Sequence, residues 1–168
     1  MATITNAVGV RWGGYGGGMG SQHFRAGVVI VVRHPDRQRV MAFERSDSPG
    51  SWQLPQGGLE VSEEPIEAAW RELMEETGLG PADVTPTAEF PDWIAYEWPN
   101  SVPGRHNKEG RRRGQVQKWF LFDVNSEDVR PSPDGSEFTD WQWVTPAWLI
   151  EQVVPWRRPV YEKVLGTL

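Results

Sequence analysis

The sequence predicts a mixed α/β fold in which helices pack in layers against one sheet. Apolar runs typical of strands alternate along the chain with three segments of helical pattern, and no break in composition marks a domain boundary. Interleaved strands and helices favour such a layered arrangement. A chain of 168 residues has the length of one domain, which can bury a full core without disulfides or metal staples.

The first strand is predicted at residues 26–33, a β-branched run suited to a buried position. Residues 34–38 contain the turn formers Pro35 and Asp36, so the chain should return as a second strand at 40–45. Further extended segments are predicted at 51–55, within 89–98, at 117–124 and at 140–144.

The clearest helix covers residues 65–77. Pro65 suits its first position, because the missing N–H costs nothing there, and Gly78 follows its end, where a left-handed residue is favoured. Shorter helices are predicted at 146–152 and from about residue 157. The apolar positions of the main helix recur at helical spacing and should form its buried face. They are Ile66, Ala69, Trp70, Leu73 and Thr77.

The first 23 residues differ from the rest of the chain. The segment 12–20 is so rich in glycine that little in it can offset the entropy lost on ordering. We therefore predict a flexible arm at 1–23 and one folded domain at 24–168. No apolar run approaches the roughly 20 residues of a membrane span, and the start lacks the pattern of a signal peptide. We expect no membrane contact and a cytoplasmic location.

The composition excludes several kinds of chemistry. Without cysteine, the chain cannot form disulfides, thiolate nucleophiles or zinc–thiolate sites. With three histidines, a multi-histidine centre is not expected, so a bound metal should be a hard ion held by oxygen ligands. The net charge of −6 argues against broad affinity for nucleic acids but is compatible with a local basic patch.

Three glutamates on the main helix indicate a cation site. Glu72, Glu75 and Glu76 stand at positions i, i+3 and i+4, so they project from one side of the helix. Like charges at these spacings cost an isolated helix roughly 0.2–0.5 kcal/mol per pair, and the helix dipole disfavours anions near its C-terminal end. Clustered carboxylates suit Mg²⁺, for which Mn²⁺ can substitute. Because the opposite helix face is apolar, we expect the carboxylates to face a cleft.

Two further features support this site. A guanidinium can grip a carboxylate with two hydrogen bonds, so we expect Arg71 to hold Glu63, or one of the helix glutamates, in place. Gly57 and Gly58 precede the loop that leads into the helix, and glycine there permits close approach of the backbone to a ligand or a metal.

These residues match the Nudix box at every specified position. The box is a glycine, five residues, a glutamate, seven residues, Arg-Glu-apolar, one residue, Glu-Glu, one residue and Gly-apolar. The matching residues are Gly57, Glu63, Arg71-Glu72-Leu73, Glu75-Glu76 and Gly78-Leu79. The chain thus resembles the Nudix hydrolases. The resemblance implies an α/β/α sandwich with a mixed sheet and a catalytic loop–helix–loop. It also implies a metal held by Glu72, Glu75 and Glu76 next to Gly57.

Outside the box, residues 24–166 resemble the subgroup of bacterial RNA 5′-pyrophosphohydrolases and diadenosine polyphosphate hydrolases. The strings that carry the resemblance are FRAGVV, SWQLPQGG, GQVQKWF and EFTDWQWV. It implies a further metal-binding carboxylate at Glu137, phosphate contacts at Arg25 and Lys118, and a base-stacking aromatic at Trp156. Tyr96 is either a base contact or an ordinary strand residue.

The implied reaction is hydrolysis of a phosphoanhydride bond, with a glutamate of the cluster as general base. The substrate is a dinucleoside polyphosphate or a 5′-triphosphorylated RNA end. Other nucleoside triphosphates or diphosphate-linked nucleotides are an alternative, as is a Nudix module that binds nucleotides without hydrolysing them. A basic segment within 105–113 is either a solvated loop or a loop that binds the phosphates of the substrate. If it binds phosphates, the affinity for the substrate should fall as the salt concentration rises.

Overall fold

Eight strands form one mixed sheet in the computed structural model, which describes residues 23–99 and 112–168. The central strands are β1 and β7, which run parallel, while every other pairing is antiparallel. The sheet order is β3-β2-β1-β7-β5, with β4 paired to β1, β6 to β7 and β8 to β2. The strands are β1 (His23–Arg33), β2 (Val40–Arg45), β3 (Trp52–Gln53), β4 (Gln56–Gly58), β5 (Val84–Glu89), β6 (Ile94–Glu97), β7 (Arg112–Val124) and β8 (Phe138–Val144).

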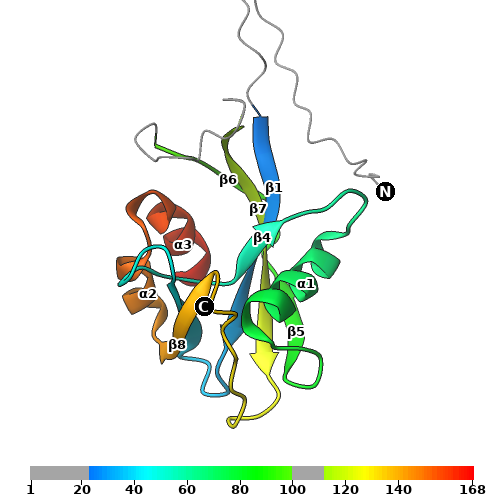
Figure 1. The fold of residues 1–168 in the computed structure, drawn as a ribbon, viewed down its shortest axis with the longest axis vertical. Coiled ribbons are helices and arrows are strands. Elements are labelled where there is room, and N and C mark those ends of the chain that lie inside the picture. The colour runs from blue at the N-terminus through cyan, green and yellow to red at the C-terminus, as the bar shows by residue number, and fades with distance from the viewer. Residues whose placement is uncertain (1–22, 100–111) are drawn as a thin grey trace, which may run out of the picture.

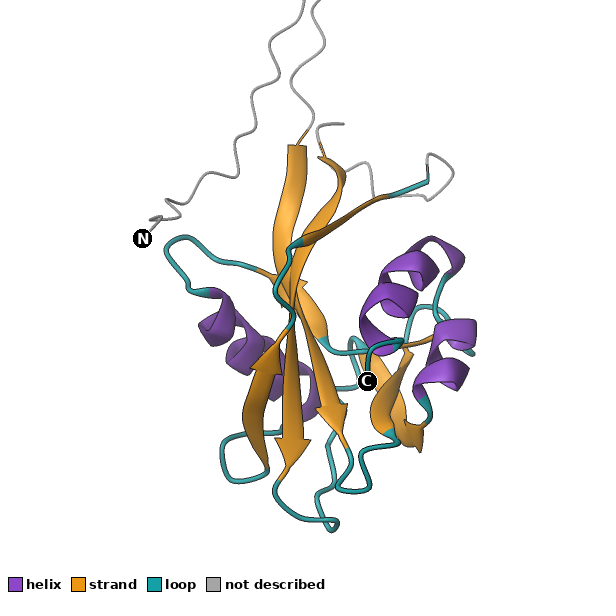
Figure 2. Cartoon of the chain, turned by 180° about the vertical axis from the view of Figure 1, so that it is seen from behind, coloured by secondary structure: helices purple, strands orange, loops and turns teal. Residues whose placement is uncertain are grey.

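Helices cover both faces of this sheet. Helix α1 (Pro65–Thr77) lies on one side of the strands, and α2 (Pro146–Gln152) and α3 (Arg158–Leu165) lie on the other, as the two opposite views in Figure 1 and Figure 2 show. A short 3₁₀ turn, Pro155–Arg157, connects α2 to α3. None of the helices within the described ranges combines the length and apolar content that crossing a membrane requires. The α/β/α sandwich predicted from the sequence is confirmed.

The two cores of the sandwich meet at strand β1. Val29 and Val31 belong to the buried cluster that includes α2 and α3 residues, while Val28, Ile30 and Val32 belong to the cluster that includes α1 residues. Side chains alternate between the faces of a strand, so a strand covered on both faces must be apolar at every position. This is why the uninterrupted β-branched run correctly predicted a buried strand.

Helix α1 has the predicted bounds. The Glu64 backbone N–H donates to Glu67 Oε2 at 3.0 Å at its start, and Gly78 has a φ of 71° at its end. The predicted buried face is partly wrong, because Ile66 is 36% exposed and Ala68 is fully buried. The buried stripe is rotated toward Ala68, and this rotation brings Glu76 onto it.

Some element boundaries differ from those predicted. Strand β5 was not predicted, since its sequence contains Pro86 and most of its side chains are exposed. Strand β7 begins at Arg112 rather than at 117, because the residues before 117 also pair with β1. The predicted arm at 1–23 lies outside the described residues, except for His23, which is the first residue of β1. Residues 105–111 of the basic segment also lie outside the described ranges.

Candidate active site

A polar cavity of about 410 Å³ lies between the end of α1 and strands β1, β4 and β7. Carboxylates and guanidiniums both contribute to its wall. Most of its polar side chains come from elements that are far apart in the sequence, so the fold assembles it. The lining residues are Arg25, Arg45, Asp47, Gln56, Gly57, Glu72, Glu76, Gln115, Glu137 and Arg157.

Arg71 connects the loop before α1 to the acidic side of the helix. Its Nε and Nη2 donate to the two carboxylate oxygens of Glu63 at 2.8 and 2.9 Å, and Nη2 also donates to the Gly58 carbonyl at 2.9 Å. Its Nη1 donates to Glu72 Oε1 at 2.7 Å. The hydrogen bonds from Arg71 lower the pKa of Glu63. Both contacts that the sequence offered for Arg71 are therefore formed, and the guanidinium fixes the direction of Glu72.

The two glycines of β4 leave space for charged side chains of the protein itself. A Cβ at Gly57 would lie 1.8 Å from Cδ of Glu72, and a Cβ at Gly58 would lie 2.2 Å from Nη2 of Arg25. Both distances are impossible for real atoms. Glycine at both positions thus leaves room for Glu72 and Arg25 to reach over the β4 backbone toward the cavity, and a larger residue would displace these side chains.

Glu76 is the most buried acid of the site. It is 8% exposed, and its Oε2 accepts a hydrogen bond from the Gln56 backbone N–H at 3.0 Å. Burial, together with the negative charges of Glu137 and Glu72, raises its pKa to about 9. Burial also raises the pKa of Glu72, although Arg71 opposes that shift. Glu76 therefore favours its protonated form unless a positive charge enters the cavity.

Glu137 reaches this wall from the loop before β8. The loop is tied to the end of α1, because Ser132 N–H donates to the Thr77 carbonyl at 2.8 Å. Within the loop, the Asp134 carboxylate accepts from the Glu137 backbone N–H at 2.9 Å. The Glu137 carbonyl in turn accepts from Ser46 N–H at 3.0 Å. These backbone contacts place the Glu137 side chain in the cavity beside Glu72 and Glu76.

The donor set fits a hard divalent cation. Glu72, Glu76 and Glu137 supply carboxylate oxygens to one cavity, and such oxygens are what Mg²⁺ and Mn²⁺ prefer. A cation among them would offset the burial that raises the pKa of Glu76. Among the described residues, no three acidic or histidine side chains are already gathered at metal-binding distances. The structure thus assembles the donors without closing them into a preformed cage.

Guanidiniums form another part of the cavity wall. Arg45 and Arg157 are 6% and 1% exposed, and Arg45 is held by Asp47 through hydrogen bonds of 2.7 and 2.5 Å. Among the described residues, Arg157 has no carboxylate partner. Its contacts are neutral, with Nε donating to Tyr96 Oη at 3.2 Å and Nη1 to Gln53 Oε1 at 2.5 Å. A buried cation paired only with neutral groups is costly, so this wall is suited to an anion.

The remaining predicted site residues lie outside the cavity lining. Glu75 has a side chain that is 60% exposed, 3.5 Å from Arg71. Lys118 is buried and donates to the Pro91 carbonyl at 3.0 Å, with Glu89 3.4 Å away. Trp156 is half-buried against the core cluster on the α3 side.

Tyr96 contacts two residues that line the polar cavity. It is 8% exposed and donates to Gln115 Oε1 at 3.0 Å, while it accepts from Arg157. Its ring lies in a buried polar network and is not presented to solvent. Sequence reasoning missed Arg45, Gln115 and Arg157. Gln115 could have been suspected from its place in the string GQVQKWF, whereas none of the strings that carry the resemblance includes Arg45 or Arg157.

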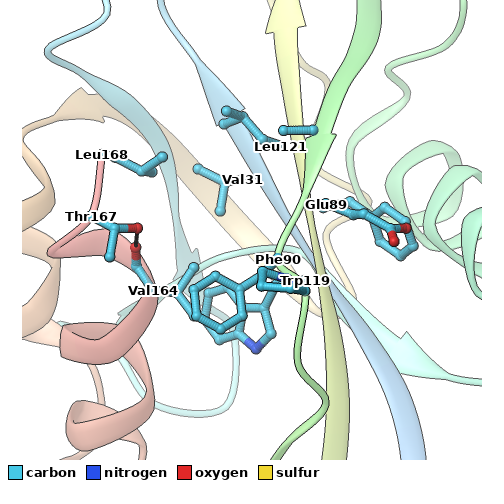
Figure 3. A pocket seen from close by; sticks show the side chains of 11 residues that line it. Val31, Glu89, Phe90, Trp119, Leu121, Val164, Thr167 and Leu168 are labelled. Atoms are coloured by element: carbon cyan, nitrogen blue, oxygen red, sulfur yellow. Dashed lines mark hydrogen bonds between the residues drawn. The ribbon is translucent and has the colours of Figure 1, made fainter.

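A second cavity, of about 290 Å³, lies between the sheet and the C-terminal end of α3. Figure 3 shows that the side chains around it include Val31, Phe90, Trp119, Leu121, Val164 and Leu168. Glu89 is the one ionisable residue in its lining. Because the lining of this cavity is mostly apolar, the polar cavity is the candidate active site.

The fold and the acidic loop–helix–loop define the class of the protein. A family model described as NUDIX domain matches residues 23–164. The E. coli dihydroneopterin triphosphate pyrophosphohydrolase has a similar structure, with a TM-score of 0.70 at 20% identity, covering 86% of this chain and 99% of that one. The chain therefore belongs to the Nudix hydrolase family.

Curated relatives refine this placement. Nudix hydrolase 25 of Arabidopsis thaliana is 40% identical over 152 residues, covering 86% of this chain and 85% of that protein. An RNA pyrophosphohydrolase of Cereibacter sphaeroides (strain KD131) is 41% identical over 144 residues, covering 84% of this chain and 86% of that protein. Within its family, this chain is a pyrophosphohydrolase that acts on phosphorus-containing acid anhydrides.

Proposed function

We propose that the protein hydrolyses a phosphoanhydride bond at the 5′-triphosphate end of RNA, with Mg²⁺ as cofactor and Mn²⁺ as a substitute. The observation that carries the proposal is one cavity in which an acidic wall and buried guanidiniums lie together. Such a cavity suits a chain of phosphates that carries its own divalent cation. Identity of about 40% to proteins named RNA pyrophosphohydrolase supports the RNA end as the first candidate.

Glu72, Glu76 and Glu137 would hold the cation, and Glu75 could join them only by turning from its exposed position. When bound, the cation would shield the phosphate charge and help to generate the attacking water. Arg71 and Glu63 keep Glu72 directed at the cavity. A glutamate of this cluster accepts the proton from the water as general base.

The guanidiniums of Arg25, Arg45 and Arg157 would bind phosphate oxygens through charge-assisted hydrogen bonds. Because Arg157 is buried with no carboxylate partner in residues 23–99 and 112–168, a bound phosphate would supply the opposite charge. These groups would hold the phosphate chain in place, and positioning together with charge stabilisation accounts for most of the catalysis in phosphoryl transfer.

A dinucleoside polyphosphate such as diadenosine tetraphosphate is the second candidate. It offers the same run of anhydride-linked phosphates, and the resemblance of residues 24–166 extends to enzymes that act on such compounds. Lys118 and Trp156 would take part in either case only after moving from their present contacts. Arg25, by contrast, already lines the cavity.

The test is a substrate panel with purified protein at a fixed Mg²⁺ concentration. It compares a 5′-triphosphorylated oligonucleotide, diadenosine tetraphosphate, nucleoside triphosphates and a nucleotide sugar. We expect the highest kcat/KM with the triphosphorylated oligonucleotide, which should be converted to its 5′-monophosphate. A clear preference for diadenosine tetraphosphate would replace the first candidate with the second. Binding of these compounds without hydrolysis of any would identify a non-catalytic nucleotide-binding module.

A further inference from the structure

Two guanidiniums of the polar cavity converge on one neutral oxygen. Gln53 ends strand β3 and is 1% exposed. Its Oε1 accepts a hydrogen bond from Arg45 Nη1 at 3.0 Å and another from Arg157 Nη1 at 2.5 Å. Arg45 comes from β2 and Arg157 from the turn before α3, so this single amide joins two elements of the cavity wall.

The convergence has a cost that a carboxylate would avoid. Two guanidiniums that share one acceptor repel each other. Asp47 offsets part of this repulsion through its ion pair with Arg45, but the shared amide oxygen carries no charge of its own. The Nε2 atom of Gln53 is also buried, with no hydrogen-bond partner among the described residues. An unsatisfied buried donor costs on the order of 1–3 kcal/mol. Glutamate has nearly the same shape, and it would remove the orphaned donor and pair with both cations.

We propose that Gln53 is a positioning residue that holds Arg157 beside the Asp47-paired Arg45 while leaving the charge of Arg157, which has no carboxylate partner among the described residues, available to the phosphates of the substrate. The inference rests on the proposed function, because it assigns the guanidiniums to an anionic ligand. A neutral acceptor fixes the direction of a guanidinium without cancelling its field at the cavity. The unpaired Nε2 of Gln53 thus lowers the stability of the free protein, whereas the available guanidinium charge strengthens phosphate binding.

The first test contrasts two substitutions of Gln53. The probe is inorganic tripolyphosphate with Mg²⁺, its dissociation constant is measured by calorimetry, and Tm is recorded in parallel. Gln53→Glu should keep or raise Tm but weaken tripolyphosphate binding at least tenfold, since the carboxylate competes with the ligand for both cations. Gln53→Met should lower affinity about fivefold because the guanidiniums lose their common acceptor.

Gln142→Glu is the matched control for charge. Gln142 is a half-buried residue of β8 outside the cavity lining, so this variant adds one negative charge without approaching the two guanidiniums. It should bind tripolyphosphate within twofold of the wild type. If Gln53→Glu also binds within twofold, or if Gln142→Glu weakens binding as much as Gln53→Glu does, the proposal is overturned.

A double-mutant cycle separates positioning from a merely structural role. If Gln53 acts through the guanidiniums, Gln53→Met should change affinity less than twofold in a background that already carries Arg45→Met and Arg157→Met. An effect of the same size in both backgrounds would refute the inference. If the triple variant does not fold, the cycle is run with Arg45→Met alone, where Gln53→Met should change affinity less than it does in the wild type, although the contact with Arg157 remains. Failure of the wild type to bind tripolyphosphate would instead refute the proposed function.

Discussion

The metal-free protein should lose stability as the pH rises, because of Glu76. Burial raises the pKa of this carboxyl group to about 9 in the folded state, whereas 4.5 is its ordinary value. Between these two values the folded protein holds a proton that the unfolded chain has released. A group with a raised folded pKa contributes stability that is complete below its unfolded pKa and is lost as the pH rises through the folded pKa.

The magnitude follows from this difference of one proton. The free energy of unfolding should fall by about 1.4 kcal/mol for each pH unit within the window, or about 3 kcal/mol from pH 6 to pH 8. A domain of this size has a total stability of roughly 5–15 kcal/mol, so the change is large enough to measure. Comparison with E76Q, which lacks this proton equilibrium, removes the contribution of the titrating groups that do not interact with Glu76.

The assay is urea unfolding of the wild type and E76Q at pH 6, 7 and 8 in EDTA. The wild type should become less stable relative to E76Q by up to about 3 kcal/mol across this range. E151Q, which removes an exposed carboxylate on α2 away from the cavity, controls for the loss of one negative charge. Added Mg²⁺ at pH 8 should stabilise the wild type more than E76Q, since a ligand of the folded state raises its stability. A difference in the free energy of unfolding between the wild type and E76Q that stays constant from pH 6 to pH 8 would refute the reasoning.

Three other predictions concern the loop–helix–loop. E76Q should lose turnover by orders of magnitude with its circular dichroism spectrum unchanged, and near wild-type kcat on the preferred compound of the substrate panel would exclude Glu76 from the site. G57A should lower kcat/KM roughly a hundredfold, because its Cβ would lie 1.8 Å from Cδ of Glu72 and must displace that carboxylate; an unchanged rate would show that the position of Glu72 is unimportant. S62G should raise the free energy of unfolding by about 1 kcal/mol in urea titrations, since Ser62 has a φ of 66° that glycine adopts without strain. A destabilised S62G protein would contradict this account.

Local signals in the sequence determined helix α1 and its chemistry. Pro65 and Gly78 define the ends of the helix through their own backbone preferences, which depend little on the rest of the fold. The spacing of Glu72 and Glu76 relative to Arg71 follows from helical geometry, so their proximity could be predicted in advance. The buried strand at residues 26–33 was equally predictable, because a strand covered on both faces is apolar throughout.

Only the tertiary structure decided the other parts of the cavity. Arg45 and Arg157 lie 112 positions apart in the sequence and share an acceptor only because β2 and the turn before α3 meet at Gln53. The rotation of α1 about its axis, which buries Glu76 and leaves Ile66 half in solvent, depends on how the helix packs on the sheet. Patterns along a chain record which side chains a helix or strand can present together. The partners that those side chains meet are set by contacts between distant segments, which form only when the whole domain has folded.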